Sequence, residues 1–222
     1  MYTSKHNYDL LLDTTVPESE FSNPVWHKLT MFENAIASQK YDWLWWLDFD
    51  TLITNTSIPL HTLIPKFLHN HPSPSEIAFL LTADCFPLNA GSMIMRSSPL
   101  LTNLISSVRQ CGRDHPDKNE QDCIKDILYK TELGKKHALW VPQDEINAFS
   151  PEIPCYDEGG SGWRVGRFVV HFAGAWAHLH GYKDVTGMLM RKYAVYVDDT
   201  THEIGWAPER ETTGTEVPVK EE

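Results

Sequence analysis

The chain has 222 residues, of which 41% are hydrophobic, and its formal net charge is -11. This size and composition suffice for one substantial core and give no indication of a second domain. The negative charge disfavours nucleic acids and anionic membrane surfaces as partners, because both reward clustered lysine and arginine. A polyanionic ligand would therefore need a metal ion in order to bind.

The start of the chain and its cysteines bear on the cellular compartment. No apolar run approaches the ~18 to 20 residues that cross a bilayer, and residues 1–6 lack the basic and then apolar pattern of a signal peptide. Either the protein is soluble as it stands or the chain lacks its native start. The four cysteines have no Cys-x-x-Cys spacing, which disfavours a zinc site, and their even number permits disulfides without requiring them.

Strand and helix patterns alternate along the chain, as is typical of an α/β layer fold. Apolar runs predict strands at 8–13, 43–47, 77–82, 91–96, 139–141 and 168–172. Helices are predicted to open at Asn23-Pro24, at Ser98-Pro99 and after Asn119, and a last one over 184–197. Residues 58–75 form a segment broken by prolines.

The first predicted helix has an apolar face made of Val25, Leu29, Phe32 and Ile36. From Ala207 onward the charge, threonine and proline content predicts a disordered tail. We therefore expect one domain over 1–206 and a tail over 207–222.

Two carboxylates follow the apolar run of strand length that ends at Leu47. Side chains alternate along a strand, so Asp48 and Asp50 should share a face while Phe49 points into the core. Two carboxylates on one face at the end of a buried strand repel each other and resist desolvation unless a cation compensates. A divalent metal ion would satisfy both. The alternative is that one aspartate caps the next element and the other is solvated.

A histidine ends another apolar strand, at His171. Such a histidine is commonly a hydrogen-bonded core residue. Two carboxylates and one imidazole, however, make a ligand set that suits Mn²⁺ and leaves open positions for substrate oxygens. In that case Gly174 gives the backbone room to approach a phosphate.

A polar turn at 84–91 runs into the strand between these two motifs. One interpretation is a loop chosen for its turn geometry. The other is that Asp84 and Asn89 offer hydrogen-bond acceptors and donors to sugar hydroxyls beside the metal. Gln143 and Asn147, after the strand at 139–141, are likewise open to a turn role or to acceptor hydroxyls. Trp163 and Trp176 lie near the site, where packing competes with stacking on a pyranose ring.

Five ordered blocks carry a family resemblance: Trp45–Asp50, Asn89–Ser98, Glu120-Gln121, Val141–Ala148 and His171–Gly174. The chain resembles the galactosyl/mannosyl transferase family, which includes fungal Golgi α-1,2-galactosyltransferases, α-1,6-mannosyltransferase subunits and plant xyloglucan xylosyltransferases. The resemblance covers roughly Pro24 to Val197. It implies a GT-A-like, Rossmann-like fold with a single twisted, mainly parallel sheet flanked by helices.

The resemblance also implies site residues. The metal ligands are expected to be Asp48, Asp50 and His171, with Mn²⁺ as cofactor. Substrate contacts are expected at Asp84, Asn89, Gly91, Gln143 and Gly174. Glu120 and Gln121 fall where relatives place an acidic residue and a glutamine beneath the reacting sugar carbon. For Glu120, a carboxylate that complements the helix dipole is the structural alternative.

The implied activity is that of a retaining hexosyltransferase. It would transfer a hexose from UDP-galactose or GDP-mannose to an α-mannoside or another glycan acceptor, on the lumenal side of the Golgi membrane. Only residues 1–22 precede the first block, so the nucleotide-binding part is expected to be N-terminally truncated. Two alternatives stay open: a catalytically inactive member that acts as a subunit of a glycosyltransferase complex, and a metal-dependent hydrolase.

Overall fold

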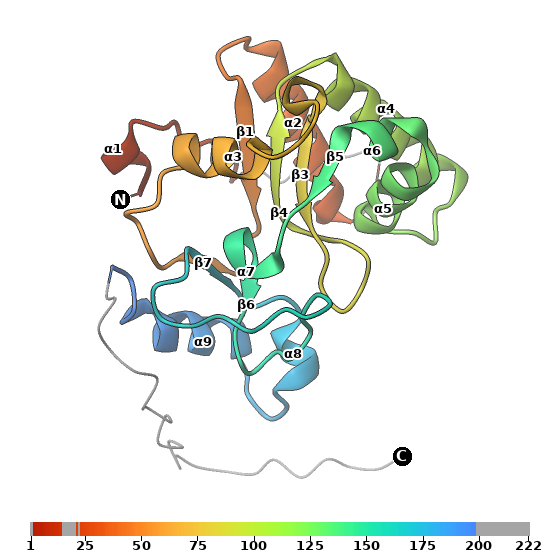
Figure 1. The fold of residues 1–222 in the computed structure, drawn as a ribbon. Helices are drawn as coiled ribbons and strands as arrows, with labels where there is room; N and C mark the ends of the chain where they lie inside the picture. The colour runs from red at the N-terminus through yellow and green to blue at the C-terminus, as the bar shows by residue number, and fades with distance from the viewer. Residues whose placement is uncertain (1, 15–20, 22, 199–222) are drawn as a thin grey trace, which may run out of the picture.

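The computed structural model describes residues 2–14, 21 and 23–198, which form an α/β fold with two sheets (Figure 1). The four-stranded sheet has the order β1-β4-β3-β5, and the three-stranded sheet has the order β2-β7-β6. The strands are β1 (Trp43–Leu47), β2 (Thr51–Ile53), β3 (Phe79–Thr82), β4 (Asn89–Arg96), β5 (Ala138–Trp140), β6 (Ala148–Phe149) and β7 (Val169–His171).

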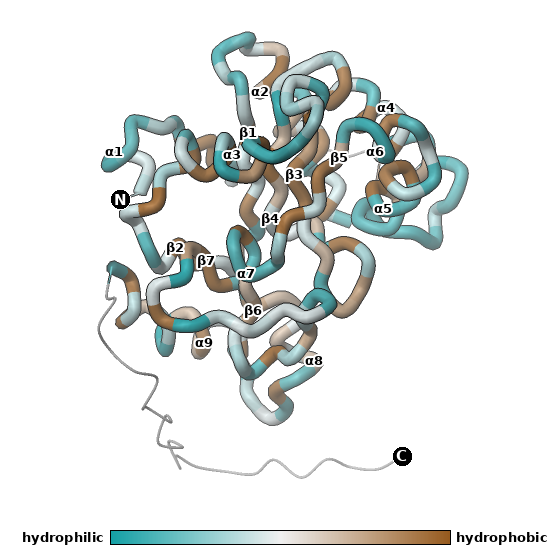
Figure 2. The backbone as a smooth tube through the Cα atoms, in the orientation of Figure 1, coloured by the Kyte–Doolittle hydropathy of each residue, from teal (hydrophilic) through white to brown (hydrophobic). Residues whose placement is uncertain are grey.

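Helices flank both sheets. In chain order they are α1 (Tyr2–His6), η1 (Pro24–Trp26), α2 (His27–Ala37), α3 (Leu60–Leu68), η2 (Pro74–Glu76), α4 (Pro99–Asp114), α5 (Glu120–Lys130), α6 (Glu132–His137), α7 (Gln143–Ile146), α8 (Ala175–His178) and α9 (Val185–Ala194). Hydrophobic residues concentrate along the central strands, whereas the outer turns of the helices are largely hydrophilic (Figure 2).

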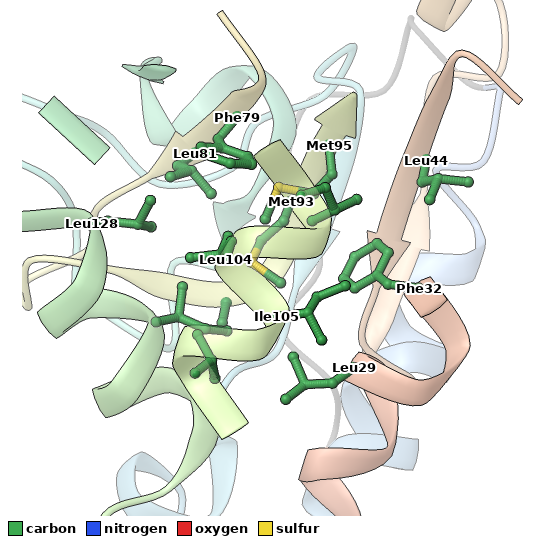
Figure 3. Packing of buried hydrophobic residues seen from close by; sticks show 14 of the residues in the cluster. Leu29, Phe32, Leu44, Phe79, Leu81, Met93, Met95, Leu104, Ile105 and Leu128 are labelled. Carbon is green, nitrogen blue, oxygen red and sulfur yellow. The ribbon is translucent and has the colours of Figure 1, made fainter. Parts of the chain in front are cut away.

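The main core lies between the four-stranded sheet and helices α2, α4 and α5. Leu29 and Phe32 of α2 pack near Leu44, and Leu104 and Ile105 of α4 lie against the methionines of β4 (Figure 3). The opposite face of this sheet, with Leu80 and Ile94, packs against α3. A separate cluster beside the three-stranded sheet includes Phe172, Leu189 and Trp163.

The α/β class agrees with the sequence analysis, but the single, mainly parallel sheet was wrong. The pairs β1/β4, β3/β4 and β2/β7 are antiparallel, and only β3/β5 and β6/β7 are parallel among the described residues. The reason lies in the connections. Residues 83–88 between β3 and β4 are too few for the crossover of roughly a dozen residues that parallel pairing requires.

Most predicted elements are present, and the predicted start of the helix at Asn119 is confirmed in detail. The Asn119 side chain accepts a hydrogen bond from the backbone N–H of Asp122 at 2.8 Å, as an N-cap does. The proline-broken segment contains a helix that the sequence analysis missed, α3, which carries Pro65 inside it. The tail predicted from Ala207 lies outside the described residues.

Three local predictions were wrong. Residues 8–13 form no strand; Tyr8 and Asp9 bond through their side chains to His61 and Tyr41. Val25 is exposed; η1 buries Trp26 instead, and α2 buries Leu29, Phe32 and Ala35. Phe49 is 84% exposed, because β1 ends at Leu47 and the residues after it turn rather than continue the strand.

Two disulfides cross-link the fold, as the even cysteine count permitted. Cys85–Cys155 ties the loop between β3 and β4 to the segment after β6, across 70 residues of chain. Cys111–Cys123 joins α4 to α5, with a separation of only 12 residues. Within the described ranges, no helix combines the length and apolar character of a membrane span.

The two disulfides should differ in their contribution to stability. A cross-link restricts the unfolded chain more when it closes a longer loop. We expect the Cys85→Ser/Cys155→Ser double variant to lose about 4 kcal/mol of unfolding free energy and Cys111→Ser/Cys123→Ser about 3 kcal/mol. Urea unfolding without reductant measures both values. Equal losses, or a larger loss for the shorter loop, would contradict the loop-entropy argument.

Candidate active site

The two aspartates lie at the junction of the two sheets, on the turn that connects β1 to β2. The backbone N–H of Asp48 donates to the Gly91 carbonyl on β4 at 2.8 Å, so Asp48 is attached to the four-stranded sheet. The Asp50 carbonyl accepts from the Phe172 N–H at 2.9 Å, so Asp50 is attached to the three-stranded sheet. The turn, and not the strand alternation predicted from the sequence, brings the two carboxylates to one place.

His171 completes this group. Strand β2 pairs with β7 so that Thr51 stands opposite His171, which brings the preceding Asp50 beside the imidazole. Asp48, Asp50 and His171 each offer one ligand atom, and these three atoms lie within 4.8 Å of one another. The aspartate side chains are 36% and 29% exposed, whereas the imidazole beneath them is 2% exposed. The group is therefore open on its carboxylate side.

The protonation state of Asp50 suits a cation site. Burial raises the pKa of the Asp50 carboxyl, but the hydrogen bond and charge of His171 and the charge of Lys28 outweigh it. The pKa of Asp50 therefore lies below its ordinary value, and the group is ionised at neutral pH. A carboxylate must be deprotonated to bind a metal ion.

A chain of hydrogen bonds fixes which nitrogen of His171 carries a proton. The Gly91 N–H donates to the Asn89 side-chain oxygen at 3.0 Å, so that oxygen is an acceptor. The Asn147 amide must then face it with its NH₂ group, at 3.0 Å, and it also donates to the Thr82 hydroxyl at 2.8 Å. This leaves the Asn147 oxygen facing His171 Nδ1 at 2.8 Å.

It follows that Nδ1 of His171 carries a proton, while Nε2 is hydrogen-bonded to an Asp50 carboxylate oxygen at 3.1 Å. With Nδ1 engaged by Asn147, Nε2 is the ring nitrogen that faces the two carboxylates. Metal-binding histidines are commonly oriented through the other ring nitrogen in this manner. The sequence pattern indicated only a turn role or an acceptor-binding role for Asn147.

Gly91 provides space for the imidazole. A Cβ atom at this position would lie 2.2 Å from Cε1 and 2.9 Å from Nε2 of His171, which no real side chain tolerates. Glycine is therefore required at 91 because the ring lies against its backbone. The predicted substrate contact of Gly91 stays a prediction, while its steric role is evident from the structure.

Lys28, on α2, was not foreseen. Its ammonium is buried, with the side chain 4% exposed, and it lies 2.8 Å from Glu120 and 3.6 Å from Asp48. It also donates to the Ala90 carbonyl at 3.3 Å and lies 5.3 Å from the centroid of the Trp46 ring. Lys28 therefore holds a buried positive charge against two acidic residues of the candidate site.

The predicted catalytic pair, Glu120 and Gln121, lies at the start of α5. The two side chains reach the site through Lys28 and through the backbone of β4. Glu120 is 5% exposed and forms the ion pair with Lys28. The Gln121 side-chain oxygen accepts from the Ala90 N–H at 2.8 Å, next to Gly91. Both residues therefore adjoin the group that surrounds His171. Their catalytic role stays a prediction.

The predicted substrate contacts Asp84, Gln143 and Gly174 lie in different surroundings. Asp84 joins the His171 network, because its carboxylate accepts a hydrogen bond from the Asn89 amide at 3.1 Å. Burial raises the pKa of the Asp84 carboxyl, although hydrogen bonds from Phe86 and Asn89 act in the opposite direction. Gln143 is engaged elsewhere, donating to the Cys155 carbonyl and accepting from the Asp157 N–H. Gly174 adopts a left-handed backbone with φ of 61° and has open space where a side chain would stand.

One alternative that the sequence left open is resolved near the site, and the structure adds a second group of ligand-type residues. Trp163 is 1% exposed and packs in the core, where its indole N–H donates to the Thr54 hydroxyl at 3.0 Å, so it is no stacking platform. Asp84, Cys85 and Cys155 form a second close group of ligand-type residues. Its two sulfurs are joined to each other in a disulfide, so they are not available as thiolate ligands.

The model of the galactosyl transferase GMA12/MNN10 family matches residues 1–180 of the chain. The chain belongs to this family. It is 27% identical over 206 residues to an uncharacterized alpha-1,2-galactosyltransferase of Schizosaccharomyces pombe, covering 78% of this chain and 53% of that protein. It is 25% identical over 232 residues to a probable alpha-1,6-mannosyltransferase of Saccharomyces cerevisiae, covering 86% and 59%.

The galactosyl transferase family identified from the sequence is thus confirmed, although the chain spans only about half the length of these curated relatives. A solved structure shares the fold: a glycosyltransferase involved in the glycosylation of the major capsid of PBCV-1. The two superpose with a TM-score of 0.62 at 14% identity, over 86% of this chain and 87% of the other. This likeness confirms the α/β glycosyltransferase fold predicted from the sequence.

The buried Lys28–Glu120 pair leads to a stability prediction. Removing one member leaves the other charge buried without its partner, which costs about 3 to 5 kcal/mol. We expect Lys28→Met to lose this much unfolding free energy in urea. Adding Glu120→Gln to Lys28→Met should restore much of it, since the uncompensated charge is gone.

The control is Lys66→Met, which breaks the Lys66–Glu145 pair at the surface, where the lysine side chain is 58% exposed. Exposed pairs contribute about 1 kcal/mol or less. If Lys28→Met lost no more unfolding free energy than Lys66→Met, the buried Lys28–Glu120 pair would matter no more to stability than an exposed pair. That result would contradict the prediction.

Proposed function

We propose that this galactosyl transferase family member is a retaining glycosyltransferase. It transfers a hexose from a nucleotide sugar, UDP-galactose or GDP-mannose, to a glycan acceptor with the help of Mn²⁺. The convergence of Asp48, Asp50 and His171 within 4.8 Å carries this proposal. The names of the relatives support the choice of galactose or mannose, since they are galactosyl- and mannosyltransferases.

The donor set fits Mn²⁺. Two carboxylates and one imidazole nitrogen give three ligands of the kind that this ion binds, with further positions left for substrate oxygens. The partial exposure of both aspartates leaves that side accessible to a diphosphate. When bound, the ion would supply neutralisation of the negative charge on the diphosphate leaving group.

The chain's own residues would then position the donor. Asp84, as a hydrogen-bond acceptor held by Asn89, would bind sugar hydroxyls at the edge of the group. Gly174, with open space beside it, would let the backbone approach a phosphate oxygen. Lys28 holds Asp48 and Glu120 together, so it would preserve the geometry of the site during turnover.

Retention of configuration results when the acceptor hydroxyl attacks on the face from which the diphosphate departs. In this step the anomeric C–O bond to the diphosphate breaks, the acceptor oxygen forms the new bond, and its proton passes to a departing phosphate oxygen. The anomeric carbon is oxocarbenium-like at the transition state. Glu120 and Gln121, which adjoin the site from α5, would stabilise that positive charge.

The two disulfides support a proposal on location. Disulfides persist in oxidising compartments and are rare in the cytosol. Both bridges of this chain join elements that pack together in the fold, namely α4 with α5 and the β3–β4 loop with the segment after β6. We place the protein on the lumenal side of the Golgi membrane, in keeping with the family resemblance.

Nucleotide binding tests the function directly. A ligand at ~100 times its dissociation constant should add about 2.7 kcal/mol to stability. We expect UDP-galactose or GDP-mannose to raise the melting temperature in the presence of Mn²⁺. With EDTA we expect no shift from either nucleotide sugar. Asp50→Ala should abolish the shift, while Asp114→Ala, which changes an exposed aspartate at the end of α4, should keep it.

Binding followed by transfer of labelled hexose to an α-mannoside would establish catalysis. Binding without transfer to any glycan would favour an inactive subunit of a glycosyltransferase complex. A Mn²⁺-dependent shift that survives Asp50→Ala would exclude the proposed metal site, and hydrolysis of simple phosphate esters without nucleotide would indicate a hydrolase.

Asn147 gives a second test of the metal site. Residues that orient a metal-binding histidine typically contribute 10- to 100-fold to metal affinity. We therefore expect Asn147→Leu to weaken Mn²⁺ binding, measured by electron paramagnetic resonance, by about that factor. Asn34→Leu, on the exposed side of α2, serves as the matched control. Wild-type affinity in a folded Asn147→Leu protein would show that His171 needs no such support.

A further inference from the structure

Large exposed aromatic side chains gather on the segments that build the candidate site. Five aromatic residues are exposed in the described ranges: Phe49, Phe86, Tyr129, Trp176 and Tyr182. The three most exposed are Phe49 at 84%, Trp176 at 75% and Phe86 at 66%. Phe49 lies between Asp48 and Asp50, Phe86 lies two residues after Asp84, and Trp176 lies five residues after His171.

Phe49 is held outward by its two neighbours. The Asp48 N–H is bonded to Gly91 on one sheet, and the Asp50 carbonyl is bonded to Phe172 on the other. The backbone of the turn therefore cannot rotate to bury the ring without breaking one of these bonds. An apolar ring fixed in water between two metal-ligand candidates serves no packing purpose.

Phe86 is fixed on three sides. Its N–H donates to the Asp84 carboxylate at 2.6 Å, and its carbonyl accepts from the Asp84 N–H at 3.0 Å. The preceding residue, Cys85, is bridged to Cys155, and the following one, Pro87, accepts a hydrogen bond from Tyr129 at 3.0 Å. The loop is thus rigid while the ring projects from it.

Trp176 projects from α8, which follows the strand that carries His171. The left-handed Gly174 turns the chain into the helix, and Ala175 is fully buried with its N–H bonded to the Phe172 carbonyl at 3.1 Å. The side chain of Trp176 faces the other way and stays exposed. The β3–β4 loop and α8 both lie at the end of the four-stranded sheet that is nearer the second sheet (Figure 1).

We infer that Phe49, Phe86 and Trp176 form the acceptor subsite, where they stack on the pyranose rings of a neutral oligosaccharide. This inference rests on the proposed function, which requires an acceptor near the metal group. All three residues connect to His171 through the short chains of contacts described above. An aromatic face packs well against the C–H face of a pyranose ring.

The charge of the chain bears on the chemistry of the acceptor. A net charge of -11 repels anions at long range. It therefore disfavours sulfated and phosphorylated glycans and favours neutral ones. Rings fixed by bonded backbones also lose little freedom on binding, which favours affinity for a weakly binding sugar chain.

Acceptor binding by single variants tests the inference. Neutral α-linked mannotriose, cellotetraose and galactotriose are titrated into the full chain and followed by saturation-transfer NMR. We expect Phe49→Ala, Phe86→Ala and Trp176→Ala each to raise the dissociation constant of the best-bound sugar by two- to tenfold. Phe86→Tyr and Trp176→Phe, which keep a ring, should stay within twofold of wild type.

Val195→Ala is the matched control, since it changes a side chain that is 66% exposed beyond the end of α9. Wild-type sugar affinity in all three alanine variants would overturn the inference, as would failure of the wild-type chain to bind any of the three sugars. An altered oligomeric state of the alanine variants on size exclusion, with sugar affinity intact, would also overturn it in favour of a protein contact.

The titration uses no donor, which separates the two proposals. If Mn²⁺-dependent nucleotide binding is absent but the alanine variants lose sugar binding, the proposed function fails and the aromatic subsite stands. If nucleotide binding is present and the variants keep sugar binding, the subsite fails alone.

Discussion

The structure depends on the way one turn joins two sheets. The turn from β1 to β2 is bonded to β4 through the Asp48 N–H and, through the Asp50 carbonyl, to Phe172, the residue after β7. Neither sheet alone could place two carboxylates above the imidazole of His171. A hydrophobic cluster that contains Leu80 and Ile94 of one sheet and Val169 of the other also connects them. The ligand geometry and the packing of the sheets are therefore set together.

Polar groups buried in this junction are satisfied as one network. The asparagines at 89 and 147 connect a backbone N–H on β4 to the histidine on β7, and each donor has one acceptor along the way. A buried network of this kind rigidifies a site when every member is paired. Lys28 and Glu120 add a compensated pair of charges on the other side. The site is consequently preorganised before any ligand arrives.

Much of this could be predicted from the sequence where local chemistry decides. The apolar strands, the Asn119 cap and the pairing of Asp-x-Asp with a distant histidine were visible, and the family resemblance ordered them. Long-range geometry was not. The sequence pattern placed the aspartates on a strand, whereas a turn carries them, and it took no account of Lys28. Lys28 lies on the same face of α2 as Phe32 and Ala35, four and seven residues later. A lysine on the apolar face of a helix could have indicated a buried charge.

The absence of a side chain at position 91 has a consequence for paralogues and genome surveys. Any residue but glycine there would drive the imidazole off its position while the sheets could still assemble. Under the proposed function, a family member that keeps Asp-x-Asp but replaces this glycine should thus be folded yet inactive. The codon at this position would then separate active from inactive members better than the acidic motif itself.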